Sequence, residues 1–392
     1  MNIAFLTPEF PTEDPQSGGV GSYIDKMAKC LNNAGHNIHI YVVSHNKTSE
    51  SYLYNGITVI RIPSVNNIVV KIIVRIFNII PYLKCGGIIK NIINAWNIAA
   101  MLRRKNIKYD IVQSTNYRLT GLFINSRNIK NHFVRISSSR ILFDQSNDRK
   151  ISFGQQINGI LEQHIMKKAD VVYAPSRLLS DHYSRIINKP VAVVRPPYSI
   201  NSLEFGDISE LQLPERYFVH FGSLCKRKGT IFISKALKLA WNYEPDIKMV
   251  LIGVNIFDTF EEFSKIIGSK RNNIVWLGPR DRSIVYSVIK KSVASVLPSR
   301  IDNLPNTAIE SLTFGIPVIG TKNSSIDEIV EPGINGELVF IDDVESLAHV
   351  LVKAWRGEYQ WQQAGISTSK IFREMSPDRA VDNFFRIRIN DN

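Results

Sequence analysis

The sequence predicts an α/β protein made of two Rossmann-like domains, each a doubly wound parallel sheet. Short β-branched runs alternate with helical patterns from one end of the chain to the other, as they do in parallel α/β folds. The chain has 392 residues, which exceeds one typical core and favours two or three domains. Two such domains are expected to face each other and to hold a ligand in the cleft between the carboxyl ends of their sheets.

The expected strands fall into two series. In the first half of the chain they cover residues 2–7, 37–43, 57–63, 110–115, 132–137, 171–175 and 191–195. In the second half they cover residues 217–222, 248–254, 273–278, 293–298, 316–320 and 337–340. Adjacent prolines, Pro196 and Pro197, enforce an extended connector between the series. We therefore expect an N-terminal domain over residues 1–198 and a C-terminal domain over residues 199–376, with a final helix, 377–389, that packs back on the first.

The composition is that of a soluble globular protein, with 44% hydrophobic and 21% charged residues. Its cysteines, Cys30, Cys85 and Cys225, have no paired spacing, which fits a reducing compartment better than a disulfide or metal framework. The first residues lack the basic region and the cleavage site of a signal peptide, so none is expected, and no apolar run reaches transmembrane length. The protein is therefore expected in the cytoplasm.

A formal net charge of +13 and a pI of about 9.5 predict an anionic partner. A nucleotide sugar, a membrane lipid and a nucleic acid are the three classes that this charge allows. The basic residues are dispersed and lack interleaved aromatic residues at stacking spacing, so no nucleic acid is expected as a partner.

The loop after the first expected strand contains Gly18 and Gly19 directly before a helical pattern. Glycine allows the backbone to approach a ligand closely, and the free amides at the start of a helix attract phosphate. The glycine spacing differs from that of a dinucleotide fingerprint. Two interpretations stay open: a phosphate-binding loop, or a flexible first loop with a glycine at the helix start.

A second loop between a strand and a helix, residues 222–229, carries Ser223 and the cations Lys226, Arg227 and Lys228. Three cations at the carboxyl end of a sheet suit a diphosphate. The alternative is a solvated charge cluster. Lys228 precedes the glycine that opens the helix and is the best single candidate for a phosphate contact.

Two carboxylates, Asp302 and Glu310, flank a turn that leads into a short apolar helix. The residues at the end of this turn are Leu304, Pro305, Asn306 and Thr307. A helix start can hold an anion, and carboxylates pair with the hydroxyls of a sugar. The segment therefore predicts a site for a phosphate-bearing sugar. The alternative is structural: Thr307 and Glu310 match a capping box, and Asp302 could cap the turn.

These segments resemble the retaining glycosyltransferases of family 4, which share the GT-B architecture. The hallmark of that family is a Glu-x7-Glu pair, and Asp302 and Glu310 keep its spacing with Asp in the first place. The resemblance covers most of the chain and is strongest over residues 217–340. Further motifs that carry it lie at residues 298–299, 303–307, 315–319, 327–330 and 333–336, and upstream at 18–20, 35–36, 109–112, 168–170 and 175–176.

The resemblance implies that the N-terminal domain, residues 1–198, binds the acceptor and that the C-terminal domain, residues 199–376, binds the nucleotide sugar. It also implies a role for each matching residue. Glu310 would hold the ribose hydroxyls of the nucleotide, and Asp302 would face the hydroxyls of the donor sugar. The backbone amides of residues 304–307 and of Gly18 and Gly19 would meet the diphosphate. The counter-ion of the diphosphate would be Lys228.

Two positions depart from the pattern of the family. Ser223 stands where the family usually has an arginine paired with the lysine, and Arg227 is the residue that could replace it. Ser137 stands where relatives often place a histidine in the cleft. An inactive relative that only binds nucleotide or glycan is therefore one alternative function.

Two helical patterns in the first half, residues 69–80 and 88–104, combine broad apolar faces with cations at their edges. Such helices suit a membrane interface with anionic lipids, so a peripheral position on the inner face of the membrane is one expectation for residues 69–105. The alternative is that these helices only cover the N-terminal sheet. A lipid-linked acceptor would explain both the helices and the net charge.

The function expected from these features is that of a retaining glycosyltransferase of hexosyltransferase type. It would move a sugar from a nucleotide-diphosphate-sugar donor to a glycan or glycolipid acceptor in cell-surface polysaccharide or glycoconjugate biosynthesis. No histidine has metal-ligand spacing with an acid and no Asp-x-Asp motif occurs, so no cofactor or metal is expected. A nucleotide-sugar epimerase of the same architecture is the other alternative.

Overall fold

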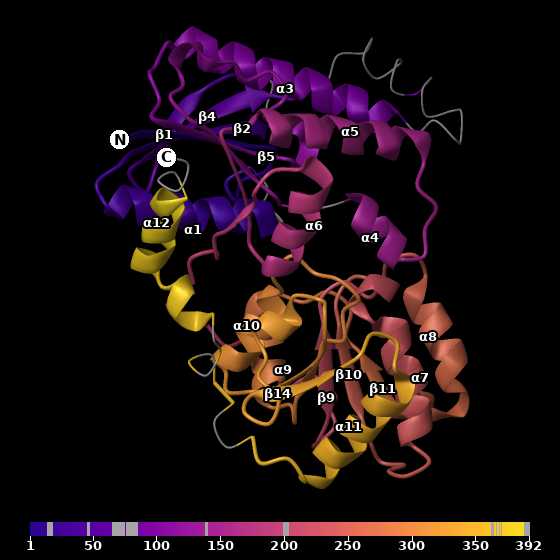
Figure 1. The fold of residues 1–392 in the computed structure, drawn as a ribbon. Coiled ribbons are helices and arrows are strands. Elements are labelled where there is room, and N and C mark those ends of the chain that lie inside the picture. The colour runs from indigo at the N-terminus through magenta and orange to yellow at the C-terminus, as the bar shows by residue number, and fades with distance from the viewer. Residues whose placement is uncertain are drawn as a thin grey trace. The chain divides into compact units, whose positions relative to one another are not determined.

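The computed structural model describes residues 1–13, 19–44, 48–64, 75, 85–137, 140–198, 204–361, 364, 365, 367, 369 and 371–387 (Figure 1). The chain divides into two compact units. Unit 1 comprises Met1–Gln145, Lys150–Ser199 and Glu374–Asn392, and unit 2 comprises Ser146–Arg149 and Ile200–Arg373. The short segment Ser146–Arg149 belongs to unit 2 although both of its neighbours in the sequence belong to unit 1. No pattern in the sequence predicted this division.

The sheet of unit 1 has the order β3-β4-β2-β1-β5-β6-β7-β8. Its strands are β1 (Asn2–Thr7), β2 (Asn37–Ser44), β3 (Ser51–Tyr54), β4 (Ile57–Pro63), β5 (Ile111–Thr115), β6 (His132–Arg135), β7 (Val171–Ala174) and β8 (Ala192–Val193). All neighbouring strands are parallel except β3, which runs antiparallel to β4 at the edge. The sequence did not predict β3, because this edge strand has one exposed and one half-buried face and lacks a buried apolar run.

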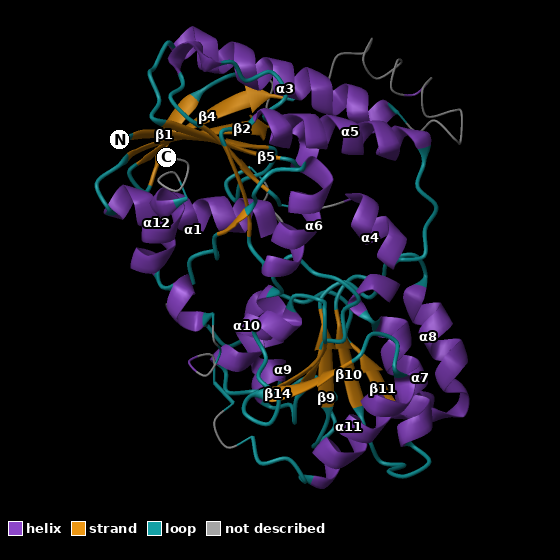
Figure 2. Cartoon of the chain, in the orientation of Figure 1, coloured by secondary structure: helices purple, strands orange, loops and turns teal. Residues whose placement is uncertain are grey.

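Helices cover both faces of this sheet (Figure 2). They are α1 (Gly19–Asn33), α3 (Gly86–Lys105), α4 (Arg140–Ser146), α5 (Phe153–Lys168), α6 (Arg177–Ile187) and α12 (Pro377–Arg386). One face packs on α1 and α12, and the ring of Phe384 from α12 lies among the buried side chains of that core. The other face packs on α3, α5 and α6. The C-terminal helix is thus part of unit 1.

The sheet of unit 2 has the order β11-β10-β9-β12-β13-β14, and every neighbouring pair is parallel. The strands are β9 (Phe218–Phe221), β10 (Met249–Ile252), β11 (Ile274–Trp276), β12 (Ser295–Val296), β13 (Val318–Thr321) and β14 (Gly336–Val339). The helices are α7 (Thr230–Ala240), α8 (Thr259–Ile267), α9 (Arg282–Lys290), α10 (Asn306–Thr313) and α11 (Val344–Arg356). α7, α8 and α11 cover one face, and α9 and α10 lie on the other (Figure 2).

The predicted strands are all present in both units, with boundaries that differ by one or two residues at most. The strand order of unit 2 places β9 beside β12, and the chain proceeds outward from this pair in both directions. Open α/β sheets bind ligands at the carboxyl edge beside such a pair of strands. In unit 1 the corresponding pair is β1 and β5.

Candidate functional site

The loop after β9 is held against the end of β12 by a glycine. This loop forms a single 3-10 turn, η3 (Lys226–Lys228), followed by Gly229 with a φ of 80°. A Cβ atom at this position would lie 2.1 Å from the carbonyl oxygen of Pro298. Only glycine permits this approach, and it brings the cations of the loop next to the segment that follows β12.

Asp302 lies in that segment and pairs with two of the cations. Lys228 donates a hydrogen bond from Nζ to Oδ2 of Asp302, and Nη1 of Arg227 lies 3.7 Å from Oδ1. The backbone N–H of Asn303 donates to the same Oδ1 at 3.0 Å. Asp302 is buried, with 12% of its side chain exposed. The sequence predicted only that these three side chains lie at the same edge of the sheet. The structure shows that they form one ion-paired cluster.

The charge state of Asp302 follows from two opposing effects. Burial raises the pKa of its carboxyl group, but the positive charges of Lys228 and Arg227 and the hydrogen bonds of the cluster outweigh burial, so the pKa lies below its ordinary value of 3.8. The carboxylate is therefore ionised at neutral pH. Two cations share one anion, and the cluster has a net positive charge.

A second group of contacts fixes Arg227. Its backbone carbonyl accepts from the N–H of Arg300 at 2.8 Å, its N–H donates to Oδ1 of Asn147 at 2.9 Å, and its guanidinium donates to the carbonyl of Ile301 at 3.1 Å. Asn147 lies in the short segment Ser146–Arg149 that joins unit 2. The segment thus helps to fix the backbone of Arg227, a residue predicted to bind phosphate.

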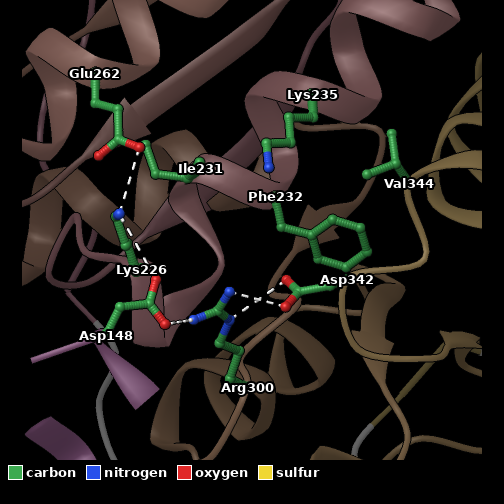
Figure 3. A pocket seen from close by; sticks show the side chains of 9 residues that line it. All are labelled: Asp148, Lys226, Ile231, Phe232, Lys235, Glu262, Arg300, Asp342 and Val344. Atoms are coloured by element: carbon green, nitrogen blue, oxygen red, sulfur yellow. Dashed lines mark hydrogen bonds and ion pairs between the residues drawn. The ribbon is translucent and has the colours of Figure 1, made fainter. Parts of the chain in front are cut away.

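Arg300 anchors this arrangement in a small polar pocket (Figure 3). Its guanidinium lies between Asp148 and Asp342, at 2.8 Å from each, and Lys226 lies between Asp148 and Glu262. Burial lowers the pKa of Arg300, but the two carboxylates raise it further than burial lowers it. Arg300 was not predicted from the sequence as a site residue. Its position two residues before Asp302 was a signal, but no pattern pointed to Asp148, which lies far away in the sequence.

His220 is a further residue that sequence analysis missed. It is buried in β9, where Nδ1 lies 2.8 Å from the carbonyl oxygen of Val296 and Nε2 lies 3.2 Å from the hydroxyl of Thr230. Burial and the charge of Lys228 lower its pKa to about 4, although the bond to Val296 raises it. A neutral imidazole therefore links β9, β12 and the start of α7 directly behind the cationic loop.

The helix α10 supplies the anion-binding end of the predicted site. Pro305 is its N-cap and has no side-chain capping bond, so the interpretation of Thr307 and Glu310 as a capping box is wrong. Among the residues that the structure describes, the backbone N–H groups of Asn306 and Thr307 have no acceptor, as expected for a first turn. Glu310 is half-buried in the second turn.

The other predicted residues of unit 2 have distinct environments. Leu304 and Pro305 are buried, Asn306 is exposed, and Ser223 is exposed in the loop after β9. A Cβ atom on Gly222 would lie 3.8 Å from Cγ2 of Thr307, so this loop borders the first turn of α10. The structure therefore brings the loop after β9, the segment after β12 and the start of α10 to one edge of the sheet.

In unit 1 the predicted glycine loop is only partly described. Gly18 lies outside the described residues, and Gly19 is the exposed first residue of α1. Glu9 accepts the N–H of Gly21 through Oε1 at 3.2 Å. A carboxylate of the protein itself therefore accepts the hydrogen bond of one backbone N–H at the start of this helix.

Ser137, at the position where the family often has histidine, is buried and forms hydrogen bonds. Its hydroxyl accepts from Nη1 of Arg135 at 2.9 Å, and its N–H donates to Oδ1 of Asn116 at 2.8 Å. The guanidinium of Arg135 lies 3.8 Å from the ring centre of Tyr23. Burial lowers the pKa of Arg135, although the neighbouring Tyr23 and Tyr173 raise it. The end of β6 thus has a buried cation next to the position where relatives often have a histidine.

The described part of the chain contains neither a group of metal ligands nor a transmembrane helix. No group of three or more histidine, cysteine, aspartate or glutamate side chains there could hold a metal ion. No described helix is long and apolar enough to cross a membrane. Of the membrane-facing patterns predicted from the sequence, residues 69–80 lie outside the described residues except for Arg75, and the second pattern corresponds to α3.

Several known proteins with related sequences are named as glycosyltransferases. An uncharacterized glycosyltransferase of Methanocaldococcus jannaschii is 22% identical over 358 residues, which cover 86% of both chains. A second one from the same organism is 24% identical over 216 residues, which are 51% of this chain and 52% of that relative. The lipopolysaccharide 1,6-galactosyltransferase of Salmonella typhimurium is 27% identical over 109 residues, 27% of this chain and 30% of that protein. In the latter two, the match spans about half of the relative's length or less.

Among solved structures, the Anabaena protein HepE in complex with UDP and glucose has a TM-score of 0.67, with 18% identity and coverage of 100% of this chain and 99% of that one. At this identity the similarity establishes the fold, which is GT-B. Residues 17–201 match the family described as Glycosyltransferase Family 4, and residues 204–366 match the family described as Glycosyl transferases group 1. The two matches together span most of the sequence, and the chain belongs to the family 4, group 1 glycosyltransferases.

Proposed function

We propose that the protein transfers a sugar from a nucleotide-diphosphate-sugar donor to a glycan or glycolipid acceptor and retains the anomeric configuration. The observation that carries this proposal is the cluster of Lys228, Arg227 and Asp302 next to the open first turn of α10. A net positive cluster beside unpaired backbone amides is suited to a diphosphate.

Each part of the cluster would have a defined task. When the sugar leaves, charge builds up on the diphosphate, and Lys228, Arg227 and the amides of Asn306 and Thr307 would stabilise it. These protein groups supply positive charge themselves, so we propose a reaction that needs no metal ion. Asp302 would hold both cations in place and present its remaining exposed edge to the donor sugar. Glu310 would bind the ribose hydroxyls of the nucleotide.

The relatives support a role in the synthesis of a cell-surface glycan. One relative is a lipopolysaccharide galactosyltransferase, and one protein of the same fold was solved with UDP and glucose. A hexose as the donor sugar and a glycan or lipid-linked acceptor are therefore the substrates that we propose. Acceptors of this kind are assembled at a membrane, and we propose that the protein contacts an anionic membrane surface from the cytoplasmic side.

The surface of α3 supports that contact. Trp96 is 55% exposed on this helix, and Arg103, Arg104 and Lys105 are exposed in its last turn. The guanidinium of Arg103 lies 5.5 Å from the ring centre of Trp96. An exposed tryptophan flanked by cations is suited to the headgroup region of a bilayer.

Two measurements test the proposed function. Thermal shifts with nucleoside diphosphates and their sugars identify the donor, because a ligand that binds only the folded state raises the melting temperature. Turnover is then measured with that donor, with and without a panel of glycan and lipid-linked acceptors, and the anomeric configuration of the product is determined by NMR. Consumption of the donor without an acceptor would instead support an epimerase, and binding without any turnover would support an inactive relative.

Glu310→Gln is the decisive variant in this assay. It keeps the size of the side chain and removes the charge that would bind the ribose, so turnover is expected to fall by about tenfold to a hundredfold. Glu345→Gln, at an exposed position in the first turn of α11, is the matched control and should retain full activity. Transfer by Glu310→Gln at the wild-type rate would show that the proposed site is wrong.

A further inference from the structure

Unit 1 contains a pocket that the proposed donor site does not use. It lies between α4, α5 and α6, and no residue that lines it belongs to unit 2. The lining residues that matter here are Ile141, Asn158, Glu162, Gln163, Tyr183 and Ile186. Apolar side chains from α4 and α6 and polar side chains from α5 thus share one small space.

Glu162 is the most buried ionisable side chain of this pocket. Its residue is 6% exposed, and its two carboxyl oxygens accept from Nδ2 of Asn116 at 3.3 Å and Nδ2 of Asn158 at 2.5 Å. Burial raises the pKa of Glu162 to about 8, although both amide bonds lower it. At neutral pH most molecules therefore carry an uncharged acid here, which can donate as well as accept a hydrogen bond.

The contacts of Asn116 place this acid at the carboxyl edge of the sheet. Asn116 follows β5 directly, and its Oδ1 accepts the N–H of Ser137, which lies just beyond β6. Its Nδ2 reaches Glu162 on α5. One buried amide thus connects the ends of two strands with the wall of the pocket. Ligands of open α/β sheets bind at this edge.

The charges around the pocket disfavour an anionic occupant. The one arginine that lines it, Arg140, has a side chain that is 62% exposed and donates to Asp144 at 2.8 Å. Burial and the charge of Arg185 lower the pKa of His182, so this imidazole is neutral at pH 7. An anion would meet no unpaired cation among the residues that line the pocket, and it would lie close to a carboxyl group.

A sugar ring combines hydroxyl groups with an apolar C–H face, and the pocket offers partners for both. Amide and acid groups from α5, including Gln163, can bond hydroxyls, which must be paired when buried. Ile141 and Ile186, from the two other helices, can pack on the apolar face. We propose that this pocket binds one neutral sugar residue of the acceptor, with Glu162 as its main hydroxyl ligand. This proposal rests on the proposed glycosyl transfer and names the part of the acceptor that unit 1 recognises.

The test is ligand binding to the full-length protein by saturation-transfer NMR. The probes are the methyl α- and β-glycosides of glucose, galactose and mannose, methyl glucuronide, inorganic phosphate and a short isoprenoid alcohol. At least one neutral glycoside is expected to bind. Glu162→Gln, whose amide has its donor and its acceptor on fixed atoms whereas the acid can carry its proton on either oxygen, is expected to weaken this binding by about tenfold. Ile186→Trp changes a side chain that is 37% exposed at the rim and is expected to block the pocket without unfolding the protein.

Two controls separate this proposal from the proposed function. Lys168→Gln, at an exposed position of α5, should leave glycoside binding unchanged. Lys228→Ala should abolish binding of the nucleoside diphosphate and leave glycoside binding intact, because the two sites share no residue.

The proposal is overturned if the wild-type protein binds the nucleoside diphosphate but none of the neutral glycosides. It is equally overturned if glycoside binding survives both Glu162→Gln and Ile186→Trp, or if only glucuronide, phosphate or the isoprenoid alcohol binds. Absence of nucleoside diphosphate binding would contradict the proposed function instead, whatever the result with the glycosides.

Discussion

The two sheets have similar strand orders, but the buried carboxyl groups near their carboxyl edges have pKa values shifted in opposite directions. In unit 2 the buried acid Asp302 is ionised, because Lys228 and Arg227 compensate it. In unit 1 the buried acid Glu162 has only amide partners and stays largely protonated. Burial acts on both carboxyl groups in the same direction, and the neighbours decide the outcome. One edge is therefore suited to a diphosphate and the other to an uncharged ligand.

Unit 1 also has a buried cation without compensation. Among the residues that the structure describes, no carboxylate lies within ion-pair distance of Arg135, and its Nε has no hydrogen-bond partner. The ring of Tyr23 and the hydroxyl of Ser137 are its contacts. Similar strand orders therefore do not imply similar electrostatics. The side chains at the strand ends, rather than the fold, set the chemistry of each edge.

The largest effect is expected from Lys228→Ala. This change removes the main cation of the cluster and leaves the buried Asp302 with Arg227 as its only cationic partner, so nucleoside diphosphate binding and turnover are expected to fall by about a hundredfold or more. Isothermal titration and the transfer assay measure the two losses. Lys238→Ala, at an exposed position of α7, is the control. Unchanged turnover in Lys228→Ala would remove the cluster from the proposed reaction.

Asp302→Asn tests the ion pairs through stability. Because the folded pKa of Asp302 is lowered, the carboxylate stabilises the folded state above its ordinary pKa of 3.8, and this contribution is lost as the pH falls through the folded pKa. The variant is therefore expected to be less stable at neutral pH by about 3 kcal/mol, with the difference shrinking in acid. Urea unfolding at several pH values measures it. A difference that does not depend on pH would mean that the charge of Asp302 is not responsible.

Membrane contact is expected to depend on the cations of α3. Replacing Arg103, Arg104 and Lys105 with glutamine should weaken binding to vesicles with anionic lipids by about fivefold for each charge removed. Co-sedimentation with vesicles of increasing anionic content measures this change. Glutamine at the exposed Lys235, Lys238 and Lys265 of unit 2 removes the same net charge and serves as the control. Equal losses in both triple variants would reduce the effect to net charge alone.

Glu162→Gln is expected to change stability with a pH dependence opposite to that of Asp302→Asn. The folded pKa of Glu162 is raised from 4.5 to about 8, so the stability that the protonated acid contributes is lost as the pH rises through this window. The variant should therefore gain stability relative to the wild type between about pH 6 and about pH 9. Thermal unfolding at both pH values measures the gain. A constant difference would indicate that Glu162 is ionised in the folded protein at neutral pH.

The sequence predicted the strands well because their buried runs are short, β-branched and separated by helical patterns. It missed β3, whose side chains are exposed or half-exposed, and it offered a capping box at Thr307 that does not form. The helix starts two residues earlier than that box requires, because Pro305 rather than Thr307 occupies the N-cap position. Local patterns therefore identified the elements, but the first residue of a helix depended on where proline fixed the backbone.

The site was predicted as a set of residue types on one edge, and its contacts were not. Lys228 and Asp302 could be placed near each other because both follow neighbouring strands of a parallel sheet. That Arg227 would also pair with Asp302, and that Asn147 and Asp148 would support the same loop, could not be predicted. Such contacts join residues far apart in sequence, and no local spacing encodes them.

By itself the sequence determined the two α/β units, the family and the residue types at the predicted donor site, because hydrophobic period and motif spacing are local properties. Only the tertiary structure decided how those residues act on one another. It paired Asp302 with two cations and surrounded Glu162 with amides, and it buried Arg135 against Tyr23. A charge state depends on burial and on neighbours in space, and those neighbours exist only once the chain has folded.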